Sequence, residues 1–174
     1  PKSAVEPSRS EIDSYGEFVK PYGAKGLAWI RAQADAWQGP IAKFLSEEER
    51  KSLGARTGLE TGDLLLFVAD DRSVAPTALG RLRGHVAAKH GLVPKDKWAF
   101  VWVERFPMFE RDKDDPSHWA AMHHPFTSPL PEDVDKILTD PGAVRARAYD
   151  IVLNGTELGG GSIRLHDPDV QQRV

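Results

Sequence analysis

The dipeptide Asn154-Gly155 constrains the fold of this chain more than any other feature, because apolar residues flank it in runs typical of β-strands. Asn-Gly is the strongest short-range signal for a two-residue hairpin turn. Such a turn sets Val152 opposite Glu157 and so fixes the pairing of the two strands. The sequence therefore predicts a β-hairpin over residues 148–164.

Two carboxylates lie close together in this predicted hairpin. Asp150 shares a strand face with Val152 and is therefore a diagonal neighbour of Glu157. Diagonal neighbours lie about 7–8 Å apart, so both carboxylates can reach one Mg²⁺ between them. Mg²⁺ prefers oxygen ligands and often holds substrate phosphates at the same time. The spacing predicts a magnesium site, and two solvated carboxylates are the alternative.

Arg164 lies an odd number of residues from Glu157, so an unbroken strand would place the two on opposite faces. Gly159-Gly160-Gly161 lies between them, and glycine runs in strands mark bulges or close approach of a ligand. We predict one bulge within this run, which brings Arg164 to the face of Glu157. The guanidinium then suits a carboxylate or a phosphate. A surface ion pair of Arg164 and a tight glycine turn form the alternative.

Composition limits the class of protein. The chain has 174 residues, 40% of them hydrophobic, and a net charge of −3, which argues against a bulk electrostatic contact with nucleic acid. It has no cysteine, which excludes disulfides, thiolate zinc sites and cysteine nucleophiles. No apolar run approaches the roughly 18 residues that a membrane helix needs, and no signal-peptide pattern is present. We expect a soluble cytoplasmic protein without a membrane partner.

His123 and His124 are adjacent, and on the strand that we expect there they point to opposite faces. One of them therefore faces a site while the other packs or meets solvent. No zinc-type spacing links them to the other histidines, His85, His90, His118 and His166. A zinc hydrolase site of His123 with Asp150 and Glu157 is a third alternative. No Gly-x-Ser-x-Gly elbow supports a serine hydrolase.

The remaining patterns predict an α+β fold. A helix is expected after Ser10, with Ile12, Tyr15 and Val19 on its buried face. A second helix should begin at the capping box of Ser46 and end at Gly58. Two more are expected over residues 75–86 and near residues 131–138. Strands are expected at residues 26–31, 41–45, 64–69 and 98–103, and around His123. Asp167-Pro168 resembles a helix N-cap followed by proline.

These motifs resemble bacterial-type aspartyl-tRNA synthetase, a class II synthetase. The resemblance rests on residues 106–110, on Met122 to Pro129 and on Ala148 to His166. Residues 22–29, 41–45 and 62–64 resemble the family's inserted domain, which is shared with a subunit of the tRNA-dependent amidotransferase. The resemblance implies an inserted α+β domain at residues 1–103 and a partial antiparallel-sheet catalytic domain at residues 104–174.

The resemblance also implies roles for individual residues. The aspartate-binding residues would be His123, Ser162 and Arg164, the ATP-binding residues Glu157, Gly159, Gly160 and Gly161, and the Mg²⁺ ligands Asp150 and Glu157. The family uses ATP to activate L-aspartate as aspartyl-adenylate and then transfers it to tRNA. No residue is expected to act as an acid or base, because this chemistry depends on positioning and charge neutralisation.

The implied partners are tRNA-Asp, with or without tRNA-Asn, and a second copy in a homodimeric parent. The chain lacks the family's anticodon-binding barrel, its three class II motifs and the opening strand of the inserted domain, so we expect the isolated chain to be inactive. Arg105 replaces the acid that usually precedes Phe-Pro. The alternative is a stand-alone tRNA- or protein-binding module with a relict hairpin. The intact Asp150, Glu157 and Arg164 argue against that decay.

Overall fold

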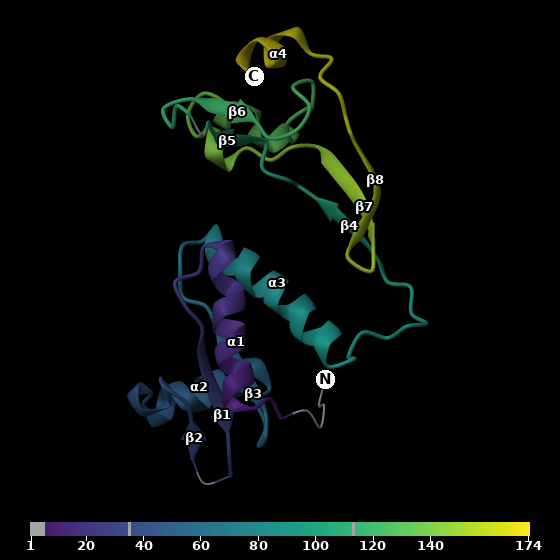
Figure 1. Ribbon diagram of the computed structural model, residues 1–174. Coiled ribbons are helices and arrows are strands. Elements are labelled where there is room, and N and C mark those ends of the chain that lie inside the picture. The colour runs from purple at the N-terminus through teal and green to yellow at the C-terminus, as the bar shows by residue number, and fades with distance from the viewer. Residues whose placement is uncertain (1–5, 35, 113) are drawn as a thin grey trace. The chain divides into compact units, whose positions relative to one another are not determined.

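The computed structural model describes residues 6–34, 36–112 and 114–174. The chain forms two compact units, Pro1–Lys95 and Asp96–Val174 (Figure 1). The boundary that we expected after residue 103 falls inside strand β4 (Phe100–Glu104). That strand pairs with β7 (Ala148–Leu153), so the hydrogen bonds of the second unit begin before residue 103. Both units combine helices with antiparallel sheet, which confirms the α+β class.

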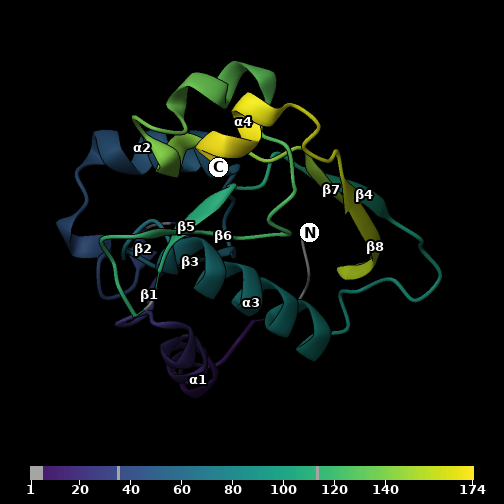
Figure 2. The ribbon, with the colours of Figure 1, turned by 90° about the horizontal axis from the view of Figure 1, so that it is seen from above.

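The first unit is built on a three-stranded antiparallel sheet in the order β2-β1-β3. Its strands are β1 (Ala28–Ala32), β2 (Trp37–Gln38) and β3 (Leu64–Phe67). The helices are α1 (Arg9–Val19), α2 (Glu47–Thr57) and α3 (Val74–Lys89), with short 3-10 helices η1 (Lys20–Tyr22) and η2 (Ala42–Phe44). Helices α1 and α3 pack side by side (Figures 1 and 2).

The core of the first unit confirms the helical periodicity. Ile12, Tyr15 and Val19 are the buried residues of α1, and α3 buries Ala78 and Leu82. Leu66 and Val86 pack against this cluster from β3 and α3. The apolar positions recur every three or four residues, so each helix presents one stripe to the core.

The helix caps differ from the sequence prediction in one detail. Helix α1 begins after Ser8 rather than Ser10, because the Ser8 hydroxyl accepts the Glu11 backbone N–H at 3.2 Å. The capping box of Ser46 and Glu49 is confirmed, and α2 ends at Gly58 with a φ of 64°.

The strand predicted at residues 41–45 is wrong. This segment contains the 3-10 helix η2, in which Phe44 N–H donates to the Ile41 carbonyl at 3.1 Å. Only the small Ala42 side chain of η2 is buried, while Phe44 is 73% exposed. The preceding proline at position 40 has no N–H to give to a sheet, which favours a local turn over pairing.

The second unit contains two sheets. The larger has the order β4-β7-β8 and ends with β8 (Thr156–Ser162), and the smaller pairs β5 (Phe109–Arg111) with β6 (Trp119–Ala121). Strands β4, β7 and β8 form one twisted ribbon that extends away from β5 and β6 (Figures 1 and 2). The helical elements are η3 (Pro131–Lys136), η4 (Pro141–Ala143) and α4 (Pro168–Arg173).

Two helix predictions in the second unit have different outcomes. The helix expected near residues 131–138 is the shorter 3-10 helix η3. The cap at Asp167 is confirmed, because its carboxylate accepts the backbone N–H groups of Asp169 and Val170. Among the described residues, no helix is long and apolar enough to cross a bilayer.

Asp133 organises the connection between η3 and the strand-like segment that follows η4. Its side chain is fully buried, and it accepts hydrogen bonds from Arg145 Nε at 2.7 Å and from Lys136 Nζ at 2.5 Å. The Arg145 backbone N–H also donates to it at 3.2 Å. The Arg145 side chain first, and then Lys136, hold the pKa of the Asp133 carboxyl far below its usual range. The carboxylate is therefore ionised throughout the ordinary pH range of the folded protein.

We predict that Asp133→Asn lowers the free energy of unfolding of the second unit by about 2–3 kcal/mol at neutral pH, because two cations lose their buried acceptor. The estimate is below that for a fully buried pair, since Arg145 and Lys136 are partly exposed. Because the pKa of Asp133 is lowered by folding, its stabilisation is complete above about pH 4 and declines as the pH falls below that value. The difference between variant and wild type should therefore shrink as the pH falls below about 4.

The measurement is urea unfolding of the whole chain, followed through amide NMR signals of each unit separately. Signals of the first unit serve as an internal reference and should not shift. Asp135→Asn is the matched control, because Asp135 lies in the same 3-10 helix but is fully exposed, 3.8 Å from Arg173. An unchanged second-unit midpoint in Asp133→Asn, or an equal loss in Asp135→Asn, would contradict the assignment.

Candidate functional site

The hairpin has the turn and the pairing that the sequence predicts. Asn154 and Gly155 have φ values of 50° and 85°, and two positive φ values in a two-residue loop are the property of a type I′ turn. Val152 pairs with Glu157, as expected. The Asn154 side chain also joins the turn to the segment before β4, accepting from Ala99 N–H and donating to the Lys97 carbonyl, both at 2.9 Å.

A bulge is present in β8, one residue before the position predicted. The register shifts between Ile151, which pairs with Gly159, and Val152, which pairs with Glu157. Leu158 is therefore the extra residue, and it is 56% exposed. The bulge lies at a side chain that faces solvent, so the extra residue does not disturb the core.

The glycine run leaves room for side chains of the neighbouring strand β7. Gly160 pairs with Asp150, and a Cβ at position 160 would overlap the Asp150 carboxylate. A Cβ on Gly161 would lie 2.8 Å from the hydroxyl of Tyr149. The Asp150 carboxylate therefore lies directly over the glycine run, which leaves room for it.

The bulge changes which residues share a face. Residues paired across a sheet lie on the same face, so Glu157 shares a face with Val152 and therefore with Asp150. Ser162 pairs with Ala148 and lies on that same face. Arg164 lies two residues beyond Ser162 and continues the alternation. The shift that we predicted for Arg164 relative to Glu157 is thus produced by Leu158.

The segment that follows the histidines inserts where the hairpin strands separate. Thr127 forms a bridge with Arg164, and Pro129 forms one with Ala146. Between them, the backbone of Ser128 is bonded to both sides, because its N–H donates to the Ile163 carbonyl at 2.8 Å and its carbonyl accepts from the Arg147 N–H at 2.8 Å. The two sequence motifs, far apart in the chain, are therefore joined by main-chain hydrogen bonds.

His123 and His124 lie in irregular chain, because β6 ends at Ala121, so the predicted strand at His123 is wrong. The His123 ring is half-buried and meets the Phe106 ring edge-on at 5.0 Å. Its Nε2 is buried and has no hydrogen-bond partner among the described residues. A buried polar nitrogen requires a partner, so a ligand atom or water is expected there. His124 is exposed, and its Nδ1 accepts from Phe126 N–H at 3.3 Å.

Arg164 is exposed beside a shallow hollow of about 530 Å³. The other lining residues are His124, Phe126, Leu165 and Gln171. Among the described residues, the side chains of Asp150, Glu157 and Arg164 form no ion pair, so the structure gives no support to the surface ion pair that we considered for Arg164.

The zinc alternative is not supported. Within the part of the chain that the structure describes, no three His, Asp or Glu side chains gather as metal ligands, so His123 does not join Asp150 and Glu157. The two carboxylates on one face still fit a cation that keeps most of its water and binds phosphate, as Mg²⁺ does.

Sequence reasoning missed two residues of this region, Thr127 and Phe126. Thr127 is 2% exposed, and its hydroxyl donates to the Ser162 hydroxyl at 3.3 Å. Its place three residues after the histidine pair was the available signal, but the contact joins residues 35 positions apart. Only the fold brings them together.

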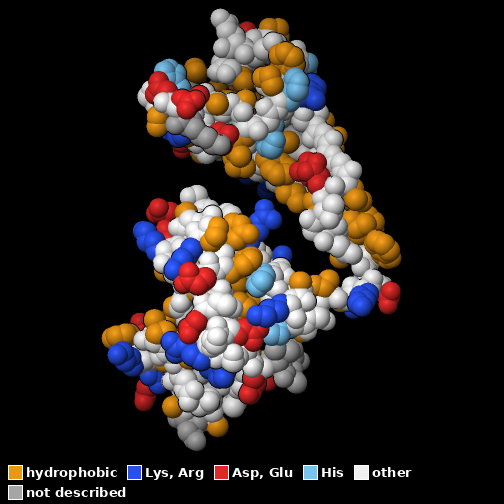
Figure 3. Space-filling view, viewed as in Figure 1, with side chains coloured by type: hydrophobic (Ala, Val, Ile, Leu, Met, Phe, Trp, Pro, Cys, Tyr) orange, Lys and Arg blue, Asp and Glu red, His pale blue; other side chains and the backbone are white. Residues whose placement is uncertain are grey.

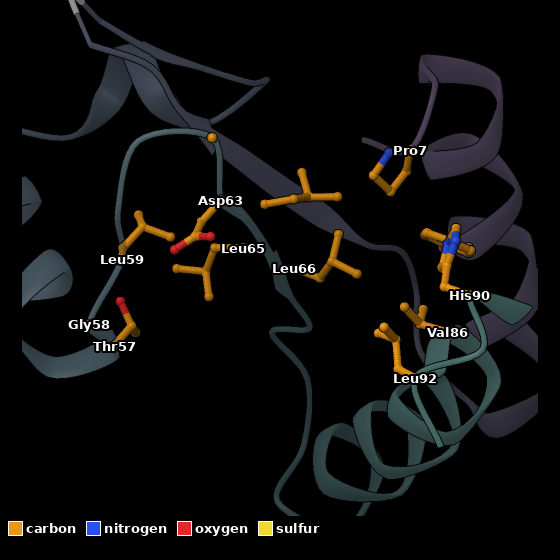
Figure 4. A pocket seen from close by; sticks show the side chains of 13 residues that line it. Pro7, Thr57, Gly58, Leu59, Asp63, Leu65, Leu66, Val86, His90 and Leu92 are labelled. Carbon is orange, nitrogen blue, oxygen red and sulfur yellow. The ribbon is translucent and has the colours of Figure 1, made fainter. Parts of the chain in front are cut away.

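The first unit has a separate hollow of about 440 Å³ along β3 and the end of α3 (Figure 4). Leu66, Val86 and Leu92 line it on the side of α3 (Figure 4). The hydroxyl of Tyr15 lies 2.8 Å from His90 Nε2 and 2.9 Å from Glu11, and burial, followed by the bond to Glu11, raises the pKa of Tyr15 to about 12. This hollow includes none of the predicted site residues.

Comparison with known proteins identifies both parts of the chain. Residues 1–79 match the GAD domain family. The whole chain is similar to proteins named aspartate–tRNA(Asp/Asn) ligase. It is 51% identical to that of Desulfatibacillum aliphaticivorans over 99% of this chain and 29% of the relative. For Nitratidesulfovibrio vulgaris the identity is 53% over 96% of this chain and 27% of the relative.

A third relative, from Geotalea uraniireducens, is 51% identical over 94% of this chain and 28% of its own length. The chain thus spans less than a third of the ligases that it matches. The matched span contains the histidine segment, the hairpin and the GAD domain together. The chain is therefore similar, over almost its whole length, to a segment of aspartate–tRNA(Asp/Asn) ligases, and its residues 1–79 match the GAD domain.

Proposed function

We propose that this segment supplies the aspartate-binding side of an aspartate–tRNA ligase active site. The parent enzyme would use ATP to convert L-aspartate to aspartyl-adenylate and would then transfer the aspartyl group to tRNA-Asp, with or without tRNA-Asn. The observation that carries the proposal is the main-chain junction of residues 127–129 with the hairpin. It supports a single site built from the histidine segment and the strand that leads to Arg164.

Arg164 is proposed to bind the side-chain carboxylate of aspartate. A guanidinium offers two parallel N–H groups to a carboxylate, and this one is exposed beside a hollow and has no ion-pair partner among the described residues. Ser162 is proposed to contact the same substrate, because it lies two residues before Arg164 on the face of Asp150. His123 is proposed as a third contact, since its buried Nε2 lacks a partner.

Glu157 and the glycine run are proposed to lie along ATP, with Asp150 and Glu157 holding Mg²⁺. The support is that both carboxylates occupy one face and that neither forms an ion pair among the described residues. Bound Mg²⁺ would supply neutralisation of phosphate charge while the α-carboxylate of aspartate displaces pyrophosphate from the α-phosphorus of ATP. Asp150 and Glu157 contribute by orienting the cation, and Gly160 contributes by leaving room over the strand for the Asp150 carboxylate.

Strand β4 supports the view that the sheet is completed by other parts of a longer protein. All five of its residues are exposed, including Phe100 at 62% and Trp102 at 59%. Apolar side chains gather along the β4-β7-β8 ribbon (Figure 3). A strand with both faces and one edge open is an unusual end for a sheet, because it leaves large apolar surface in water.

The same exposure favours a second candidate function, a binding module for tRNA or a protein partner. Under this alternative, β4 receives the partner and the hairpin has no catalytic role. We favour the ligase, because a binding module would not need Asp150 and Glu157 on one face of the hairpin. Neither carboxylate forms an ion pair among the described residues. The parent is proposed to be cytoplasmic and homodimeric in either case.

We predict that the isolated chain does not catalyse aspartate-dependent ATP–pyrophosphate exchange, because a segment with half of a site cannot position ATP for in-line attack. The measurement compares the purified chain with a full-length ligase containing this segment, at equal molar concentration. Robust exchange by the isolated chain would contradict the expectation and would show that the 174 residues are sufficient.

We further predict that Arg164→Gln in the full-length ligase raises the KM for aspartate by at least about 100-fold, since the bidentate ion pair is lost. The KM for ATP should change by less than about threefold. Arg173→Gln is the matched control, because Arg173 is an arginine of the same unit, 3.8 Å from the exposed Asp135. Steady-state ATP–pyrophosphate exchange at varied aspartate measures both constants. An unchanged aspartate KM in Arg164→Gln would refute the assigned role.

A further inference from the structure

We propose that Thr127 is a positioning residue for aspartate binding, acting through Ser162 and Arg164. The inference rests on the proposed function, because it assigns a role within that site. Thr127 shares a face with Arg164, but its side chain is only 2% exposed, so it is not proposed to touch substrate.

Burial distinguishes Thr127 from the serine residues and the other threonines. Apart from Tyr15, the buried side chains with a polar group among the described residues are Thr127, at 2% exposure, and Asp133. Asp133 is satisfied by two cations, whereas Thr127 directs its hydroxyl to the Ser162 hydroxyl at 3.3 Å. A buried hydroxyl without a hydrogen bond destabilises a fold, and the bond to Ser162 satisfies the Thr127 hydroxyl.

The contact determines how the Ser162 hydroxyl is oriented. A serine hydroxyl rotates freely about its Cβ–Oγ bond unless a partner fixes it. Because Ser162 Oγ accepts from Thr127, its own hydrogen is left to point elsewhere, toward the face that also carries Asp150. Thr127 therefore prepares Ser162 to donate to a ligand oxygen, which lowers the entropy lost on binding.

The backbone of Thr127 also positions Arg164. Thr127 and Arg164 are opposite each other in an antiparallel bridge. The bridge is closed on one side by Ser128 N–H to the Ile163 carbonyl and on the other by Leu165 N–H to the Phe126 carbonyl, both at 2.8 Å. Thr127 N–H also donates to the His124 carbonyl at 2.9 Å, which closes the turn after the histidines. One residue therefore connects the histidine segment, the serine and the arginine.

The test uses the full-length ligase with Thr127→Val, Thr127→Ser, Ser162→Ala and the double variant Thr127→Val/Ser162→Ala. Valine keeps the branched shape and removes the hydroxyl, so it should leave the backbone bridge intact and raise the KM for aspartate about tenfold, with an unchanged KM for ATP. Serine restores the donor and should keep the aspartate KM within about threefold of wild type. The double variant should be no worse than Ser162→Ala alone, because both changes remove one interaction.

Thr127→Ala serves as a second hydroxyl deletion if the valine variant fails to fold, and it should show the same selectivity for aspartate. Amide exchange of Ser128 and Leu165, whose N–H groups close the bridge, is recorded for every variant to show that the bridge remains. An unchanged aspartate KM in the folded deletion variants would overturn the proposal. So would additive effects in the double variant, or an equal rise in the KM values for aspartate and ATP.

A failure of the proposed function has a different signature. In that case Ser162→Ala and Arg164→Gln would leave the aspartate KM unchanged, or wild type would show no aspartate-dependent exchange. If these two variants do raise the aspartate KM while Thr127→Val does not, the site stands and the positioning role of Thr127 falls.

Discussion

The main-chain bonds of Ser128 to both sides of the opening hairpin are the interaction on which the second unit depends. Where β7 and β8 separate, the chain would otherwise expose unpaired N–H and C=O groups on two strands. Residues 127–130 enter that space and satisfy them. The histidine segment is thus held at the base of the hairpin by the same bonds that complete the sheet. A site composed of side chains from both segments follows from backbone satisfaction before any ligand is considered.

The bulge at Leu158 determines which side chains of β8 lie on the face of the site. The side-chain alternation of a strand has a period of two, so one extra residue reverses the face of everything beyond it. Leu158 is that residue, and its exposed side chain lets the reversal occur at the surface. The glycines that follow then admit the carboxylate of Asp150 over the strand. The bulge and the glycine run therefore have separate tasks, although both lie within a few residues.

Sequence predicts the parts of this fold that local chemistry determines. The hairpin pairing follows from Asn154-Gly155, and the buried face of α1 follows from the spacing of its apolar residues. The prediction fails at residues 41–45, where apolar composition suggested a strand but the preceding proline favours a 3-10 turn. It also misses the contact of Thr127 with Ser162, because no local pattern links residues so far apart. The roles of His123, Ser162 and Arg164 stay predictions, drawn from the resemblance and supported by their geometry.

Asn154 also determines how the molecule can age chemically. The side-chain amide of an asparagine that precedes glycine is open to attack by the glycine backbone nitrogen, because glycine has no side chain to hinder it. The attack releases ammonia and forms a succinimide, which water opens to aspartate or isoaspartate. Here the amide group donates to the Lys97 carbonyl and accepts from Ala99, so it anchors the start of the edge strand β4. Conversion to aspartate would set a carboxylate against the Lys97 carbonyl oxygen and replace an attraction with a repulsion. The residue that makes the turn is thus also the one whose slow deamidation would loosen the segment just before β4 from the hairpin turn.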